Sequence, residues 1–136
     1  MKINFKLFFI LVGLTVIFSS CRTSAPRLDY QALARASVLL GIDINLEDDH
    51  KLYLEAADWI GAPYRGGGDS KRGTDCSGMV YQIYRKVYRI QVPRNTEELK
   101  NKSNKVAKRN LKEGDLVFFS SNRSRKRVAH VGIYLK

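Results

Sequence analysis

Apolar residues recur at helical spacing through the first half of the chain. Residues 28–40 carry them at nearly every fourth position and end at Gly41, which predicts a first helix. Asp48 or Asp49 can cap a second helix that runs to Ile60, because a carboxylate before a helix accepts its free N–H groups. The predicted inner stripe of this second helix consists of Leu52, Ala56, Trp59 and Ile60.

A third helix is predicted directly after a glycine-rich loop. Residues 63–74 hold three consecutive glycines and few apolar residues, which is typical of a loop. Asp75 can cap a helix that begins at Cys76. Apolar residues at i, i+3, i+4 and i+7 give that helix one inner face, made of Val80, Ile83, Tyr84 and Val87. Pro93 then interrupts the chain.

The last third of the chain predicts one short helix and two strands. Asn95 followed by Glu98 has the spacing of a capping box, so a helix is predicted from Thr96. A turn at residues 114–115 leads into a predicted buried strand at 116–119.

A polar, basic hairpin loop at 120–127 and a second strand at 128–135 complete the pattern. Helices followed by antiparallel strands predict an α+β fold, and 136 residues are enough for one domain.

The N-terminus is patterned as an export signal. Two lysines precede an apolar run at residues 7–18, which ends in two serines and Cys21. This order is the plan of a secretory signal, and the run is shorter than the ~20 residues of a membrane span. A cysteine after small residues resembles a bacterial lipobox. We therefore predict a lipoprotein signal peptide at residues 1–20 and lipidation of Cys21; a plain signal peptide or an uncleaved anchor is the alternative.

Charge adds a preference for anionic partners. The formal net charge is +11, and removal of the two lysines in residues 1–20 leaves +9. Such a surface suits an anionic polymer or a membrane surface. Export argues against nucleic acid, so the expected polyanions are cell-wall glycan-peptide and anionic lipid. An ordinary solvated basic face remains the alternative, and the basic residues concentrate between Lys102 and Arg127.

Cys76 is the candidate nucleophile. If Cys21 is acylated, Cys76 has no cysteine partner in an exported chain, and such a thiol is a candidate reactive group. A helix start, with its free N–H groups and partial positive charge, favours the thiolate. His130 opens the last predicted strand and can act as the base. A buried structural cysteine is the alternative, but polar and glycine neighbours favour reactivity.

Four runs then resemble a known family. They are residues 61–68 (GAPYRGGG), 75–78 (DCSG), 114–119 (GDLVFF) and 130–134 (HVGIY). In this order they resemble the NlpC family of papain-like cysteine peptidases of the cell wall, and within it the Spr-type murein endopeptidase lipoproteins. The resemblance covers residues 59–136. It implies a papain-like α+β fold with N-terminal helices packed on an antiparallel sheet.

The resemblance also implies site roles. Cys76 is implied as the nucleophile and His130 as the general base, while the hydroxyl of Tyr64 points toward the thiol and the developing oxyanion. Asp75 and Ser77 are implied to bind the stem peptide of peptidoglycan. From the residues alone, Asp75 can equally be only a helix cap and Tyr64 an ordinary packing residue. Gly132, on the same strand face as His130, is expected to leave room for the helix of Cys76.

The domain division follows from these motifs. We expect a tether and helical segment at residues 21–47 and an incomplete catalytic domain at 48–136. In the family a third polar residue, often His, follows on the next strand, and the sequence stops at Lys136 before such a strand. The last strands and the residue that orients His130 are therefore expected to be missing.

The expected function is hydrolysis of peptide stems or cross-links of peptidoglycan. The alternatives are a non-catalytic lipoprotein that binds cell wall or a partner hydrolase, and an amidase at the sugar-peptide junction. No cofactor or metal is expected, because two histidines and one thiol far apart do not make a metal-site spacing. We expect a monomer that faces the periplasm from a lipid anchor in the outer membrane, since Arg22 is not the Asp associated with inner-membrane retention in some bacteria.

Overall fold

A computed structural model describes residues 28–121 and 124–136, without the side chains of 124–127. The predicted signal peptide and Cys21 lie outside the described residues. No helix in the described ranges is both long and apolar enough to cross a membrane. The elements are α2 Tyr30–Leu40, α3 His50–Ala57, β1 Asp69–Ser70, β2 Gly73–Thr74, α4 Cys76–Ile83, a π-helical turn Tyr84–Tyr88, α5 Thr96–Lys102, a 3-10 turn Lys108–Asn110, β3 Leu116–Ser121 and β4 Ser124–Ile133.

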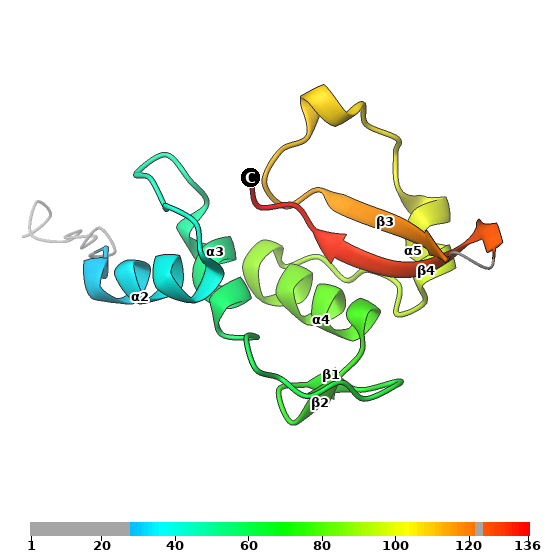
Figure 1. The fold of residues 1–136 in the computed structure, drawn as a ribbon, viewed down its shortest axis with the longest axis horizontal. Helices are drawn as coiled ribbons and strands as arrows, with labels where there is room; N and C mark the ends of the chain where they lie inside the picture. The colour runs from blue at the N-terminus through cyan, green and yellow to red at the C-terminus, as the bar shows by residue number, and fades with distance from the viewer. Residues whose placement is uncertain (1–27, 122–123) are drawn as a thin grey trace, which may run out of the picture.

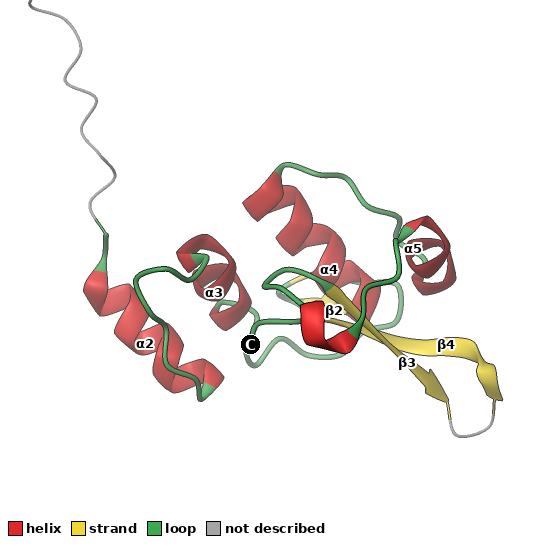
Figure 2. Cartoon of the chain, turned by 90° about the horizontal axis from the view of Figure 1, so that it is seen from above, coloured by secondary structure: helices red, strands yellow, loops and turns green. Residues whose placement is uncertain are grey.

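The α+β architecture is confirmed, and α4 is its central element. α2 and the β3–β4 hairpin lie at opposite ends of the molecule, with α4 between them (Figures 1 and 2). The small β1–β2 hairpin lies beside α4 at its N-terminal side (Figure 1). α4 contributes to both core clusters, because Ile83 packs with Leu52 and Trp59 while Val80 packs with Leu99 and Val131.

A side-chain cap begins each α-helix of the described residues, and the caps of α3, α4 and α5 were predicted. Asp29 accepts the N–H groups of Gln31 and Ala32 at the start of α2. Asp49, of the two candidates, caps α3. Asn95 accepts the N–H groups of Glu97 and Glu98 and starts α5 as predicted. Because these contacts join residues two or three positions apart, the local sequence is sufficient to predict them. Asp75 caps α4 as predicted.

The inner stripe of α3 was predicted only in part. Leu52 and Trp59 are buried, but Ile60 is 56% exposed. The α-helix ends at Ala57 and the chain continues in turns, so the helical period no longer applies at Ile60. Tyr53 is buried instead.

The predicted inner face of the third helix is confirmed by the two core clusters, and its last two residues lie in the π-helical turn that follows α4. Val80 and Ile83 are almost fully buried, and Tyr84 and Val87 pack against the clusters from the edge.

The hairpin differs from its prediction in length and burial. β3 continues to Ser121 and β4 begins at Ser124, so the strands extend into the predicted loop at 120–127. β4 ends at Ile133, before the predicted limit at 135. Phe119 is 51% exposed, so residues 116–119 are not a fully buried strand. In a hairpin covered on one face, alternate residues point to solvent.

Gly132 does not make room for α4. A Cβ on Gly132 would meet only the ring of Phe119, at 3.9 Å. The strand face that packs toward α4 carries Val131 and Ile133. Successive strand residues alternate faces, so Gly132 lies on the other side of the hairpin.

The N-terminal helices are tied to the C-terminal end by side chains. The hydroxyl of Tyr53 donates to Glu113 at 2.8 Å and to the carbonyl of Leu135 at 3.0 Å. Glu113 also accepts the N–H of Asp49 at 2.7 Å. Lys136 forms an ion pair with Asp48 just before α3. These contacts hold α3 against the segments that flank β3 and β4.

Candidate active site

Cys76 begins α4, as the sequence predicted. Asp75 precedes it in an extended conformation and accepts the N–H of Gly78 at 2.7 Å. The thiol is half-buried and unpaired. Free N–H groups of the first helical turn surround this position, and they stabilise negative charge on a thiolate or on a substrate oxygen.

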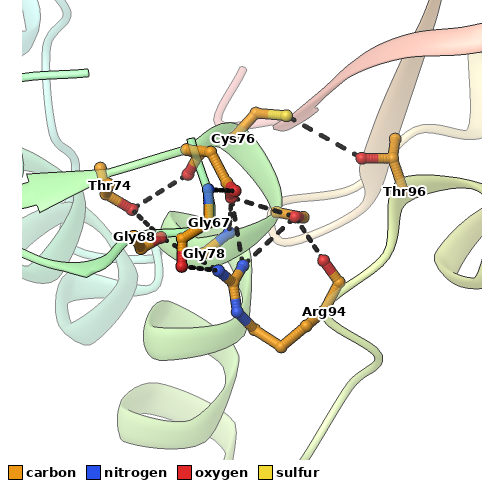
Figure 3. A network of polar contacts seen from close by, with 9 residues as sticks. Gly67, Gly68, Thr74, Cys76, Gly78, Arg94 and Thr96 are labelled. Atoms are coloured by element: carbon orange, nitrogen blue, oxygen red, sulfur yellow. Dashed lines mark hydrogen bonds and ion pairs between the residues drawn. The ribbon is translucent and has the colours of Figure 1, made fainter. Parts of the chain in front are cut away.

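Thr96 is the residue that the thiol faces. The distance between Cys76 Sγ and Thr96 Oγ1 is 3.9 Å, and Figure 3 shows the two side chains pointing toward each other. Thr96 is the first residue of α5, whose start was predicted from Asn95. The local sequence therefore located the helix start, but it held no signal that this start lies beside Cys76.

The carboxylate of Asp75 is the centre of a polar network. Its Oδ1 accepts from the N–H of Gly78, from Ser77 Oγ at 3.1 Å and from Arg94 Nη1 at 3.1 Å. Its Oδ2 accepts from the N–H of Gly67 at 2.7 Å. Burial alone raises the pKa of Asp75, but these four hydrogen bonds outweigh it and hold the pKa below its usual range.

Arg94 completes the network and was missed in the sequence. Its guanidinium pairs with Asp75 and donates to Ser77 Oγ at 3.2 Å. Its other terminal nitrogen donates to the carbonyls of Gly67 at 3.2 Å and Gly68 at 3.0 Å (Figure 3). An arginine between Pro93 and a helix cap has no periodic pattern that marks it as part of a site.

Glycine is required where the loop meets α4. A Cβ on Gly78 would lie 2.1 Å from the carbonyl oxygen of Gly68 and 2.9 Å from Arg94 Nη1. Gly67 has a φ of 75°, which favours glycine. The loop glycines therefore serve close packing of the loop on the start of α4.

Tyr64 and Ser77, the other two predicted site residues, lie in different environments. Tyr64 is 81% exposed, so its ring contributes little to the core, and its backbone pairs with Thr74 next to the cap of α4. Ser77 is buried, and its single hydroxyl proton is shared between the carbonyl of Arg94, at 2.5 Å, and Asp75 Oδ1, at 3.1 Å.

His130 lies on β4, which packs against α4. The residue after it, Val131, is fully buried in the cluster that Cys76 borders. His130 itself is exposed, and its ring centroid is 6.1 Å from that of Phe119. Within the described residues, no hydrogen bond joins the His130 ring to Cys76.

Chemically, this site presents a thiol beside polar groups. A half-buried thiol at a capped helix start, with a hydroxyl in front of it, can attack a carbonyl once it is deprotonated. Because Val131 faces α4 and successive strand residues alternate faces, His130 lies with Gly132 on the other face of β4. No group of three or more side chains that suit a metal ion gathers in the part of the chain that the structure describes.

Comparison with known proteins identifies relatives of this chain. Residues 61–136 match the NlpC/P60 family. A probable endopeptidase NlpC homolog of Haemophilus influenzae is 31% identical over 96% of this chain and 80% of its own length. The Escherichia coli K12 protein named murein DD-endopeptidase MepS/murein LD-carboxypeptidase is 37% identical over 67% of this chain, which spans about half of it (47%).

A solved structure shows the same fold. The crystal structure of an NlpC/P60 family protein from Bacillus cereus superposes with a TM-score of 0.57 and 32% identity, covering 69% of this chain and 30% of that one. The matched region contains the glycine-rich loop, Cys76 and His130. On this agreement of sequence and fold, the chain belongs to the NlpC/P60 family.

Proposed function

We propose that this chain is a cysteine peptidase that hydrolyses peptide bonds in the stems or cross-links of peptidoglycan. The observation that carries the proposal is the position of Cys76, at the capped start of α4 in a chain of the NlpC/P60 family. Relatives of this chain are named murein endopeptidases. Cys76 is the nucleophile and His130 the base.

The reaction proceeds in two steps. The sulfur of Cys76 attacks the carbonyl carbon of the substrate, and its proton passes to His130. The C–N bond then breaks, the leaving amine takes that proton, and a thioester remains. Water attacks the thioester, His130 accepts a proton from the water, and the C–S bond breaks to release the acid and restore the thiol.

The start of α4 supports the charged intermediate. N–H groups in its first turn can donate to the oxyanion, and in a well-studied hydrolase one such donor contributes about 3–4 kcal/mol. The hydroxyl of Thr96 faces the sulfur and can donate to a thiolate. In the described part of the chain, no hydrogen bond joins the His130 ring to Cys76, so the proposal requires the ring to reach the thiol when substrate is bound, and catalytic hydrogen bonds often form only then.

Stem-peptide binding is part of the proposal. The ring of Tyr64 is exposed and accessible to a bound peptide. From the resemblance, we propose that its hydroxyl donates to the oxyanion. The resemblance gives Asp75 and Ser77 a substrate-binding role as well, and both of these side chains are already engaged by Arg94.

Digestion of purified peptidoglycan tests the proposal. We expect the chain to release products whose masses correspond to cleaved stem or cross-link peptides, and we expect Cys76→Ala and His130→Ala to release none. His50→Ala is the matched histidine control and should cut like the wild type. Unchanged activity in Cys76→Ala contradicts the proposal, and products cut at the sugar-peptide junction identify an amidase instead.

Alkylation tests the thiol directly. Iodoacetamide should modify Cys76 in the folded chain faster than it modifies free cysteine at the same pH. A rate at or below that of free cysteine removes the argument for a reactive thiol.

The lipid anchor is a separate part of the proposal. We infer from the charged, apolar and small-residue order of residues 1–20 that Cys21 is acylated and holds the protein at the outer membrane, facing the periplasm. Mass spectrometry of the mature N-terminus should find a diacylated or triacylated Cys21, and Cys21→Ser should release the protein from membranes. An unmodified Cys21 contradicts the anchor without affecting the peptidase proposal.

A further inference from the structure

We propose that the groove between α5 and β3 is a docking site for an extended, acidic segment of a partner protein, which pairs with the free edge of β3. The groove has a volume of about 750 Å³ and is lined mainly by α5, β3 and the segment that joins them. This segment, residues 103–115, forms an arch between α5 and β3 (Figure 1) and is called the arch below. The inference goes beyond the proposed peptidase function and does not depend on it.

The floor of the groove is apolar. Val92, Leu116 and Phe118 line it, and all three pack against the core cluster that contains Leu99. These three residues are only partly buried, so the core cluster remains accessible on this side. Val106 of the arch also lines the groove and is 43% exposed. Accessible apolar surface in a hollow of this kind is typical of a binding site.

β3 meets the groove at its edge. Three consecutive residues of the strand, Leu116, Val117 and Phe118, line the groove. Successive strand residues point to opposite faces, so a groove that touches all three runs along the edge of the strand. Within the described residues the hairpin has two strands, so the edge of β3 away from β4 has no strand partner. The N–H and C=O groups of such an edge can pair with an added extended chain.

Lysines surround the groove from elements other than β3. Four lysines of α5 and the arch line it: Lys100, Lys102, Lys105 and Lys108. Lys102 pairs with Glu98, whereas no ion pair among the described residues engages the other three. Three positive charges are therefore free to bind an anionic partner at the rim of the groove.

The charge around the groove has one sign. Residues 100–112 contain six lysines and arginines and no acidic residue. Asp115 lines the groove as well, but its carboxylate accepts the N–H of Lys112 at 2.8 Å. Lysines that protect a strand edge from aggregation lie on the edge strand itself, and β3 carries no charged residue. The lysines of α5 and the arch are instead complementary to an acidic partner.

The strand edge favours a peptide over a membrane surface. A lipid headgroup cannot pair with both the N–H and the C=O groups of a strand edge. An extended peptide pairs with both, while its alternate side chains reach the apolar floor and the lysines. The sequence left an anionic polymer and a membrane surface open as partners of the basic residues, and the groove favours an acidic polypeptide.

The test is binding of a fluorescent probe peptide to the full chain, followed by anisotropy at a fixed, low ionic strength. The probe has about six residues, the usual length of a strand, in which glutamate and valine alternate. We expect the probe to bind, and Lys105→Glu combined with Lys108→Glu to weaken its binding roughly tenfold or more. The matched control is Lys51→Glu on α3, an exposed lysine outside the groove, which should change the affinity by less than about twofold.

Altered probes test each part of the contact. Glutamine in place of glutamate removes the charge, serine in place of valine removes the apolar contact, and N-methylation of alternate residues removes backbone donors at constant charge. We expect each change to weaken binding roughly tenfold or more. The amide signals of Val117 and Val106 in an isotope-labelled chain should shift when the original probe binds. Because Lys105 and Lys108 are exposed, their substitution should leave urea unfolding unchanged.

Three outcomes overturn the inference. Absence of probe binding does so directly. Equal effects of Lys51→Glu and of the Lys105 and Lys108 substitutions, or equal binding of the methylated probe, reduce the contact to general attraction between opposite charges. Binding of phosphatidylglycerol vesicles without binding of the probe makes the groove a membrane contact instead. Loss or retention of peptidase activity in Cys76→Ala decides the proposed function and leaves this binding test unchanged.

Discussion

At the scale of single residues, close contacts at the start of α4 decide which side chains are tolerated. Asp75 and Gly78 lie in the same first turn of α4 and are required there for different reasons. Gly78 is required because a side chain has no space beside the carbonyl of Gly68. Asp75 is required because it accepts donors from both the helix and the loop. Steric fit and charge therefore act on the same contact between loop and helix.

Gly78→Ala should destabilise the protein by about 1–3 kcal/mol. Helix propensity alone favours alanine by ~1 kcal/mol. A Cβ 2.1 Å from the carbonyl oxygen of Gly68 would force the loop and the helix apart, and we expect this steric cost to exceed the gain in helix propensity. The measurement is urea unfolding. Gly66→Ala is the control, since a Cβ there meets nothing within 4 Å. Equal stability of Gly78→Ala and wild type would show that the loop moves away at no cost.

Asp75 should make stability sensitive to acid. Its folded-state pKa lies below the ~3.9 of an unfolded aspartate, so it contributes to the free energy of unfolding above that pH. The contribution is lost as the pH falls through the folded-state pKa. The difference in unfolding free energy between wild type and Asp75→Asn should be constant above pH ~5 and shrink below pH ~4. A difference independent of pH contradicts an ionised carboxylate in the network.

At the scale of elements, the helix starts converge on the site. α4 begins at Cys76, and α5 begins at Thr96, whose hydroxyl faces the thiol. α5 is also held to the hairpin, because Glu97 accepts the N–H of Val128 in β4 at 2.7 Å. Leu99 of α5 is buried against Val80 and Val131. The cap of α5 therefore influences both the core and the position of Thr96.

Asn95→Ala should lower the free energy of unfolding by about 0.5–2 kcal/mol. The reason is that the N–H groups of Glu97 and Glu98 lose their acceptor. The same substitution at Asn101, exposed near the end of α5, should have almost no effect. Chemical denaturation of both variants measures this. A loss of stability in Asn101→Ala as large as that in Asn95→Ala would show that the capping bond does not matter.

At the scale of the whole molecule, distant parts of the chain are joined through α3. Tyr53 is fully buried and contacts Glu113 and Leu135. Burial, with the Glu113 carboxylate beside it, raises the pKa of Tyr53 far above its usual value, so its hydroxyl stays protonated and donates. The ion pair of Asp48 with Lys136 lies at the same junction. These bonds hold α3 against the segment before β3 and the segment after β4.

Tyr53→Phe should lower the melting temperature and destabilise the protein by about 1–3 kcal/mol, because Glu113 and the Leu135 carbonyl lose a donor in a partly buried place. Tyr30→Phe is the control, since Tyr30 is 69% exposed. Thermal unfolding followed by circular dichroism compares the two. A Tyr53→Phe variant as stable as Tyr30→Phe would show that water replaces both bonds.

The local sequence determined the element order, the helix caps and the family motifs. Asp49, Asn95 and Asp75 were predictable as caps because each one bonds N–H groups only two or three residues away. The inner face of α4 followed from helical spacing for the same reason. The α+β class and the NlpC/P60 likeness rest on motifs in a fixed order, and such an order is a property of the sequence.

Only the tertiary structure decided which residues meet. Arg94 reaches Asp75 across 19 positions, and Thr96 reaches Cys76 across 20. No periodic pattern encodes such contacts, because they depend on how the chain returns after Pro93. Likewise, only the tertiary structure shows that Gly132 lies on the strand face that points away from α4. It also shows that Ile60 is exposed, because α3 ends before this residue. Bonds between neighbours can be predicted from the neighbours, whereas contacts between distant residues form only when the whole fold brings them together.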